Sequence, residues 1–150
     1  MFSRLRNRSS KGDAPDDATL AEAMASLAEA FVNGIATEGH HFDYAVANAA
    51  RLDAVVDLFL ASQPGKNDVH SMQALMGAYV GELITRNGGG RWRYSLEVDA
   101  PSVILTSGLQ AFPTFKVAKR LHVGSEHSIA QFIETSMSGV LPPGARRMKH

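Results

Sequence analysis

The chain has 150 residues, of which 45% are hydrophobic and 20% are charged, and it contains no cysteine. These values predict one globular domain, and they exclude disulfides, thiolate metal sites and a cysteine nucleophile. We find neither an apolar stretch long enough to cross a membrane nor a signal-peptide pattern, so we expect a soluble, cytoplasmic protein with no transmembrane segment.

The formal net charge is zero, but the charges are unevenly distributed along the chain. Four bases, Arg4, Arg6, Arg8 and Lys11, precede the first acidic residue, and three more follow the last one. The segment between these ends is acidic, which is not typical of a nucleic-acid-binding domain, so we predict no specific nucleic-acid partner. The N-terminal bases form an electrostatic tail that we expect to make at most weak contact with an anionic surface.

Composition also divides the chain into a core region and two ends. Residues 1–18 and 138–150 are rich in breakers and bases and poor in large apolar groups. We expect both to be irregular basic tails. The foldable unit is then a single domain over residues 19–137.

The first predicted helix begins at Thr19 and ends near Gly39. Thr19 and Glu22 have the spacing of a capping box. Large apolar residues then recur at intervals of three and four, as in an amphipathic helix: Leu20, Met24, Leu27, Phe31 and Ile35.

Two more helices are predicted before residue 90. The second covers residues 44–62, with Asp43 as its N-cap, and carries an apolar stripe that includes Val55 and Phe59. The third has Asp68 as its candidate cap and continues the same kind of stripe until the glycine run at 88–90 stops it.

The hydrophobic period then changes from that of a helix to that of a strand. Residues 92–98 alternate between apolar and polar, 100–101 can turn, and 102–106 can form the antiparallel partner strand. A third edge strand is possible at 111–115. The segment 115–121 is compatible with a strand or with a short helix.

A final helix is predicted to begin at Ser125 and to extend to Met137. The fold class is therefore α+β, with three N-terminal helices, a small antiparallel sheet and a C-terminal helix.

The feature that most needs an explanation is a pair of glycines, Gly77 and Gly81, inside the third helix. A glycine there costs about 1 kcal/mol relative to alanine. Either another element packs closely against this face, or the glycines open a groove for a partner or ligand, bounded by Tyr79, Glu82 and Trp92. We take these five as the candidate binding residues.

Glu82 lies at the margin of the apolar stripe, and a buried carboxylate must find a donor or take up a proton. In the structural interpretation it pairs with Arg86 or with an arginine of the strand. In the functional interpretation it anchors a ligand, or it works as an acid–base partner of His40, His41 or His122.

Other patterns favour structural roles. No histidine spacing matches a metal motif, so we predict no metal site and no cofactor. No nucleophile motif is present, so we assign no catalytic residue. The glycine run at 88–90 follows a helix, which favours a turn over a phosphate site. Lys116, Lys119 and Arg120 are expected to form a small solvated basic patch.

The order of several short motifs resembles that of small bacterial domains of unknown function, mainly actinobacterial ones. The motifs are Phe42-Asp43-Tyr44, Leu52-Asp53, Gly77-x-Tyr79-x-Gly81-Glu82, Trp92, Phe112-Pro113 and Lys119-Arg120. The resemblance covers residues 38–137. It implies a short α+β unit and supplies no catalytic or binding residues.

The absence of a catalytic pattern and the helix with two glycines favour a non-enzymatic protein-interaction module, of an immunity-like or regulatory kind. The alternative is a small-molecule-binding or hydrolytic domain that uses Glu82 with a nearby histidine.

Overall fold

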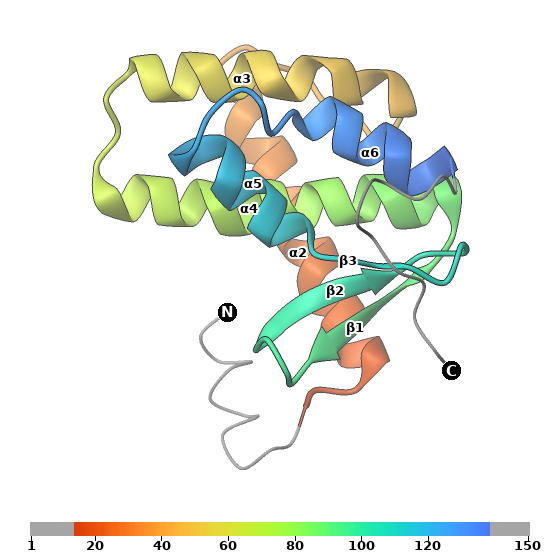
Figure 1. Ribbon diagram of the computed structural model, residues 1–150. Helices are drawn as coiled ribbons and strands as arrows, with labels where there is room; N and C mark the ends of the chain where they lie inside the picture. Colours follow the sequence, from red (N-terminus) through yellow and green to blue (C-terminus); the bar gives the residue numbers. More distant parts are fainter. Residues whose placement is uncertain (1–13, 139–150) are drawn as a thin grey trace.

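The computed structural model describes residues 14–138, and the predicted tails therefore lie largely outside the described part of the chain. Within it, α-helices and one three-stranded antiparallel sheet form the fold shown in Figure 1. The predicted α+β class is confirmed.

Helix α2 spans Asp17–Ala36. Its N-cap is Asp16, whose carboxylate accepts a hydrogen bond from the backbone N–H of Thr19 at 2.7 Å. The predicted start at Thr19 is therefore wrong, and the helix takes in the last two residues of the predicted tail. A carboxylate satisfies the free N–H groups of the first turn and is favoured by the helix dipole.

The connection to the next helix is longer than predicted. A 3₁₀ turn, η1 (Val46–Asn48), precedes α3 (Ala49–Ala61). The Asp43 carboxylate accepts from the backbone N–H of Ala45 at 3.0 Å and from the side chain of Asn48. Asp43 therefore organises the turn before η1 and is not the N-cap of α3.

Helix α4 spans Lys66–Gly88. Its N-cap is Gly65, so the predicted cap at Asp68 is wrong. Asp68 lies in the first turn, where its carboxylate accepts from the backbone N–H of Gly65 at 3.3 Å. The end of the helix agrees with the prediction. Gly89 and Gly90 have φ angles of 80° and 94°, which turn the chain from the helix into the sheet at little steric cost.

The sheet contains β1 (Arg91–Ser95), β2 (Ala100–Ile104) and β3 (Gln110–Ala111), in the order β1-β2-β3. The hairpin turn lies at residues 96–99, so its predicted place at 100–101 is wrong. Asp99 adopts a φ of 52° there and accepts a hydrogen bond from the hydroxyl of Tyr94. These two features end β1 although the alternating pattern continues.

Two helices follow the sheet, α5 (Pro113–His122) and α6 (Ile129–Ser138). Pro113 opens α5, where its missing N–H costs nothing, and does not belong to an edge strand. Residues 115–121, which are compatible with a strand or a short helix by sequence, are thus helical. The predicted cap at Ser125 is wrong, because Ser128 accepts the backbone N–H of Gln131 at 3.2 Å at the start of α6.

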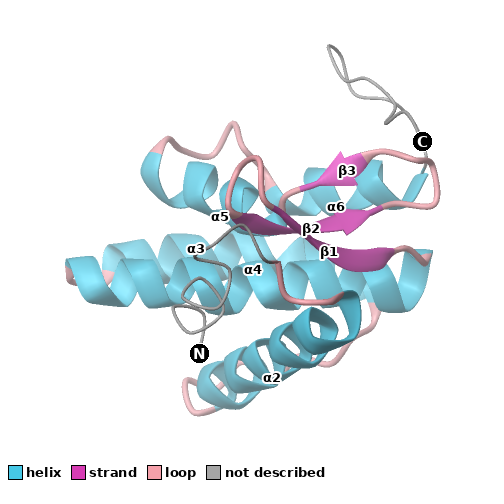
Figure 2. Cartoon of the chain, turned by 90° about the horizontal axis from the view of Figure 1, so that it is seen from below, coloured by secondary structure: helices cyan, strands magenta, loops and turns pink. Residues whose placement is uncertain are grey.

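Helix α4 is the central element of the fold. It packs against α2 on one side and against α5 and α6 on another, while β1 and β2 also touch it. Figure 1 shows α2 crossing α4 at a steep angle, and Figure 2 shows α2 and α5 on opposite sides of α4. Helix α3 packs mainly against α6. The surroundings of α4 therefore change along its length.

Candidate functional site

The two glycines of α4 are sites of close packing. A Cβ atom at Gly77 would lie 2.8 Å from the Cα atom of Thr114, at the start of α5. A Cβ atom at Gly81 would lie 2.1 Å from a carbon of the Trp92 indole ring. The interpretation that other elements pack against this face is confirmed.

The other candidate binding residues lie in the same packed region. Tyr79 is 0%, Trp92 3% and Glu82 6% exposed. The structure gives all five residues a packing role, and a partner docking on the outer surface would not touch these three side chains directly. Partner binding by this group stays a prediction.

The Glu82 carboxylate is hydrogen-bonded to Arg86 and to Trp92. Its Oε1 atom accepts from Nε and Nη2 of Arg86 at 3.0 and 2.9 Å, and its Oε2 atom accepts from Nε1 of Trp92 at 2.8 Å. The predicted pairing with Arg86 is confirmed. Within residues 14–138, no histidine forms a hydrogen bond with Glu82, so the acid–base pair required by the hydrolytic alternative is not assembled there.

The contacts of Arg86 extend to the α2–α3 connection. Its guanidinium lies 3.7 Å from the centre of the Tyr44 ring, and the Tyr44 hydroxyl donates to Glu29 of α2 at 3.2 Å. Burial raises the pKa of Tyr44 to about 12, and the nearby Glu29 carboxylate adds to this shift. Tyr44 is therefore a neutral donor at physiological pH.

Tyr79 ties the same connection to α4. Its hydroxyl donates to the backbone carbonyl of Asp43 at 2.6 Å. The centre of its ring lies 4.9 Å from the centre of the Phe31 ring. Burial raises the pKa of Tyr79 well above its usual value. The Phe42-Asp43-Tyr44 run thus fixes the α2–α3 connection to the core.

A second polar cluster was missed by sequence reasoning. Arg120 is 3% exposed, and its guanidinium contacts Asp53 at 2.9 Å and Asp57 at 2.7 Å. Its predicted place in a solvated basic patch is wrong, because the acidic side chains of α3 provide the pairing that a buried charge requires.

Asp53 also caps α6 from a distance. Its carboxylate accepts from the backbone N–H groups of Ile129 and Ala130 at 3.0 and 3.1 Å, and from the Ser128 hydroxyl at 3.0 Å. Burial acts to raise the pKa of Asp53, but these donors and Arg120 together hold it below its usual value. This cluster joins α3, α5 and α6.

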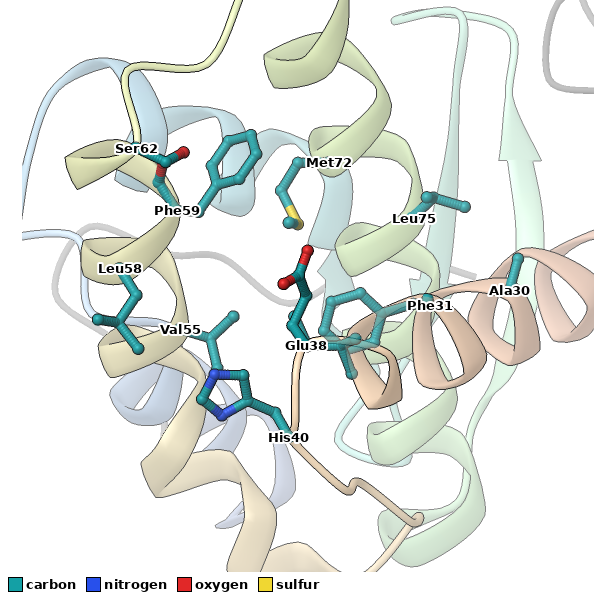
Figure 3. A pocket seen from close by; sticks show the side chains of 12 residues that line it. Ala30, Phe31, Glu38, His40, Val55, Leu58, Phe59, Ser62, Met72 and Leu75 are labelled. Atoms are coloured by element: carbon teal, nitrogen blue, oxygen red, sulfur yellow. The ribbon is translucent and has the colours of Figure 1, made fainter.

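A pocket of about 470 Å³ opens on the other side of α4, between α2, α3 and the first half of α4 (Figure 3). Side chains from the three helices point toward one another around it. Its size and mostly apolar lining are typical of a binding pocket. The larger apolar residues that line it are Phe31, Ile35, Val55, Leu58, Phe59, Met72 and Leu75.

Two titratable side chains also line the pocket. His40 is half-buried, and Figure 3 places it near Val55. Glu38 is exposed, and its carboxylate extends toward Met72. Among residues 14–138, the side-chain carboxylate of Glu38 has no hydrogen-bond or ion-pair partner, while its backbone N–H donates to the carbonyl of Ile35 at 3.0 Å. Of the three histidines considered above, His40 is therefore the one that lines this pocket, and it lies beside Glu38 rather than Glu82.

The described part of the chain holds no cluster of three or more histidine, aspartate or glutamate residues suited to a metal ion. It also holds no helix with the length and apolar character of a membrane span.

Comparisons with protein-family models, with curated proteins and with solved structures give no match to this chain. The resemblance to actinobacterial domains of unknown function therefore stays a prediction.

Proposed function

We propose that the chain is a non-enzymatic interaction module, which binds a protein partner by taking apolar side chains of that partner into the α2–α3–α4 pocket. The observation that carries this proposal is an open apolar pocket beside Leu58, which is 58% exposed. An open, mostly apolar pocket of this size is typical of binding sites.

The chemistry of the lining supports a protein partner. Phe31 and Phe59 offer aromatic surface, and the flexible, polarisable side chain of Met72 adapts to different apolar groups. The buried charged groups elsewhere, Glu82 and Arg120, are already engaged in ion pairs within the fold.

We further propose an immunity-like or regulatory role in the cytoplasm. The four bases of the electrostatic tail lie outside the described residues.

The test uses two matched leucines. Leu58 at the pocket is 58% exposed, and Leu96 at the hairpin tip is 52% exposed. Tagged full-length protein and the variants Leu58→Lys and Leu96→Lys are purified from native cells, and stoichiometric partners are identified by mass spectrometry. We expect one partner that wild type and Leu96→Lys retain and that Leu58→Lys loses.

Two results would refute the proposal. In the first, Leu58→Lys retains the partner as well as Leu96→Lys does. In the second, all three proteins emerge alone. Circular dichroism spectra of both variants check that neither leucine substitution has unfolded the chain.

A further inference from the structure

We infer that the partner segment entering the pocket is a basic amphipathic helix, which places apolar side chains between α2, α3 and α4 and a lysine or arginine next to Glu38. This inference rests on the proposed function, and it adds the chemistry of the occupant.

Glu38 places a carboxylate at the apolar pocket. Glu38 is the acidic residue of the pocket lining, and His40 is the other titratable residue there. The lining contains no lysine or arginine. The Glu38 carboxylate extends over the apolar lining in Figure 3 and has no partner in the described part of the chain. An unpaired carboxylate at the rim of an apolar pocket is available to a cation of the occupant.

The distribution of charge along the chain around Glu38 also favours a basic occupant. No lysine or arginine occurs between Lys11 and Arg51. The charged residues of α2 and of the connection that follows it, up to residue 50, are all acidic, and Arg91 of β1 pairs with Asp17 at 3.7 Å at the end of α2 away from Glu38. The remaining acidic surface attracts a positive partner. The described acids of this stretch are Asp16, Asp17, Glu22, Glu29, Glu38 and Asp43.

The bases nearest to the pocket along the chain do not neutralise Glu38. Arg51 lies 4.2 Å from the centre of the Phe42 ring and donates to the backbone carbonyl of His41 at 2.8 Å. Lys66 is the first residue of α4 and is not part of the pocket lining. The negative end of the pocket therefore stays available to an external cation.

The shape of the pocket favours a helical occupant. Its volume of about 470 Å³ exceeds that of any single side chain, so it has room for more than one apolar group of the occupant. Three helices form its walls, and an amphipathic helix lying in such a groove presents anchors at intervals of three and four residues. Basic residues that flank these anchors then lie within reach of the rim.

The test compares two synthetic amphipathic peptides binding to the ¹⁵N-labelled full-length protein. Both are acetylated and amidated and have the same leucine and phenylalanine anchors, but one has flanking lysines and the other has flanking glutamates. Shifts of backbone amides measure the affinity. An exposed ion pair is weak, so we expect the lysine peptide to bind about two- to fivefold more tightly at low salt. Added salt should reduce this preference.

The matched variants are Glu38→Gln and Glu22→Gln. Both glutamates are exposed and acidic, but only Glu38 lines the pocket. We expect the preference for lysine to disappear in Glu38→Gln and to persist in Glu22→Gln, with amide shifts centred on the pocket in each case. Equal loss in both variants would assign the preference to the general acidity of α2 and overturn the role of Glu38.

The remaining outcomes separate this inference from the function on which it rests. If both peptides bind equally at the pocket, the basic occupant is wrong while the docking function stands. If neither peptide shifts a pocket amide, both proposals fail. Shifts with 4-phenylbutylamine but with neither peptide would indicate a small-molecule site. Shifts that depend on the concentration of the protein alone would indicate a second copy of the chain.

Discussion

The two halves of helix α4 are packed in opposite ways. From Met76 to Ile84, every residue is buried, and Gly77 and Gly81 let Thr114 and Trp92 approach closely. In the first half, Met72 and Leu75 are only half-buried and border the open pocket. One helix therefore supplies both a sealed and an open part of the core, and this contrast separates residues that hold the fold from residues available for binding.

The largest effect is expected from filling the sealed half. In Gly81→Ala, the new Cβ atom would lie 2.1 Å from the Trp92 ring, so the helix or the indole must move. We expect the free energy of unfolding to fall by about 3 kcal/mol, at the upper end for overpacking. Urea unfolding monitored by the fluorescence of Trp92 measures it. A loss below about 0.5 kcal/mol would show that the packing around Gly81 relaxes enough to accept a methyl group.

The next effect concerns the cluster around Asp53. Asp53→Ala removes a partner of the buried Arg120 and the acceptor for two N–H groups of α6. We expect a loss of about 2 kcal/mol, because these groups stay buried without their partner. The control is Asp57→Ala, whose side chain is 69% exposed and which should cost less than about 0.5 kcal/mol. Equal losses would contradict the central role of Asp53.

The low pKa of Asp53 also makes the free energy of unfolding depend on pH. The pKa of Asp53 is lower in the folded than in the unfolded chain, so its contribution is present above the unfolded value, about 4. It is lost as the pH falls through the folded value. The stability gap between wild type and Asp53→Ala, measured by urea unfolding at several pH values, should therefore be constant near neutral pH and narrow below about pH 4. A gap that widens in acid would be inconsistent with the shift.

A smaller loss is expected from Glu82→Gln. The amide oxygen still accepts the Trp92 indole N–H, while the charge that pairs with Arg86 is removed. Because the Arg86 side chain is 44% exposed, we expect the free energy of unfolding to fall by only about 1 kcal/mol. Chemical denaturation in low and high salt tests this, and the loss should be smaller in high salt. A salt-independent loss would point to packing instead of charge.

The smallest effect has the opposite sign and lies on the open side. Gly34 of α2 lines the pocket, and a Cβ atom there would meet nothing within 4 Å. Gly34→Ala should therefore raise the free energy of unfolding by about 0.5 to 1 kcal/mol, through helix propensity and a less flexible unfolded chain. Thermal and urea unfolding measure it. A loss of stability would contradict the openness of this face.

Much of the fold could be predicted from the sequence, because local periodicity and turn chemistry decide it. The spacing of Leu20, Met24 and Phe31 predicts the buried face of α2. The interior glycines of α4 indicate either close packing or a groove, and the structure shows close packing. The hairpin turn could not be placed correctly. Leu96 and Val98 continue the alternation of β1 but lie exposed at the tip, since Asp99 turns the backbone there.

The long-range features were beyond the sequence for a different reason. Arg120 and Asp53 are 67 positions apart, and no local pattern indicates that they meet. Phe31, Val55 and Met72 belong to three predicted apolar stripes, and a stripe shows which face is apolar but not whether three faces close against one another. Leu58, an apolar residue outside its stripe, is the signal that could have pointed to the open pocket.

The most direct test of the central claim is the footprint of the partner recovered with the full-length protein, mapped by amide hydrogen–deuterium exchange in the free and bound chain. Our account predicts new protection in the three segments that surround the pocket, residues 30–40, 55–62 and 72–75, with little change at the hairpin tip, residues 96–99. Protection at the hairpin tip with an unchanged pocket would contradict it.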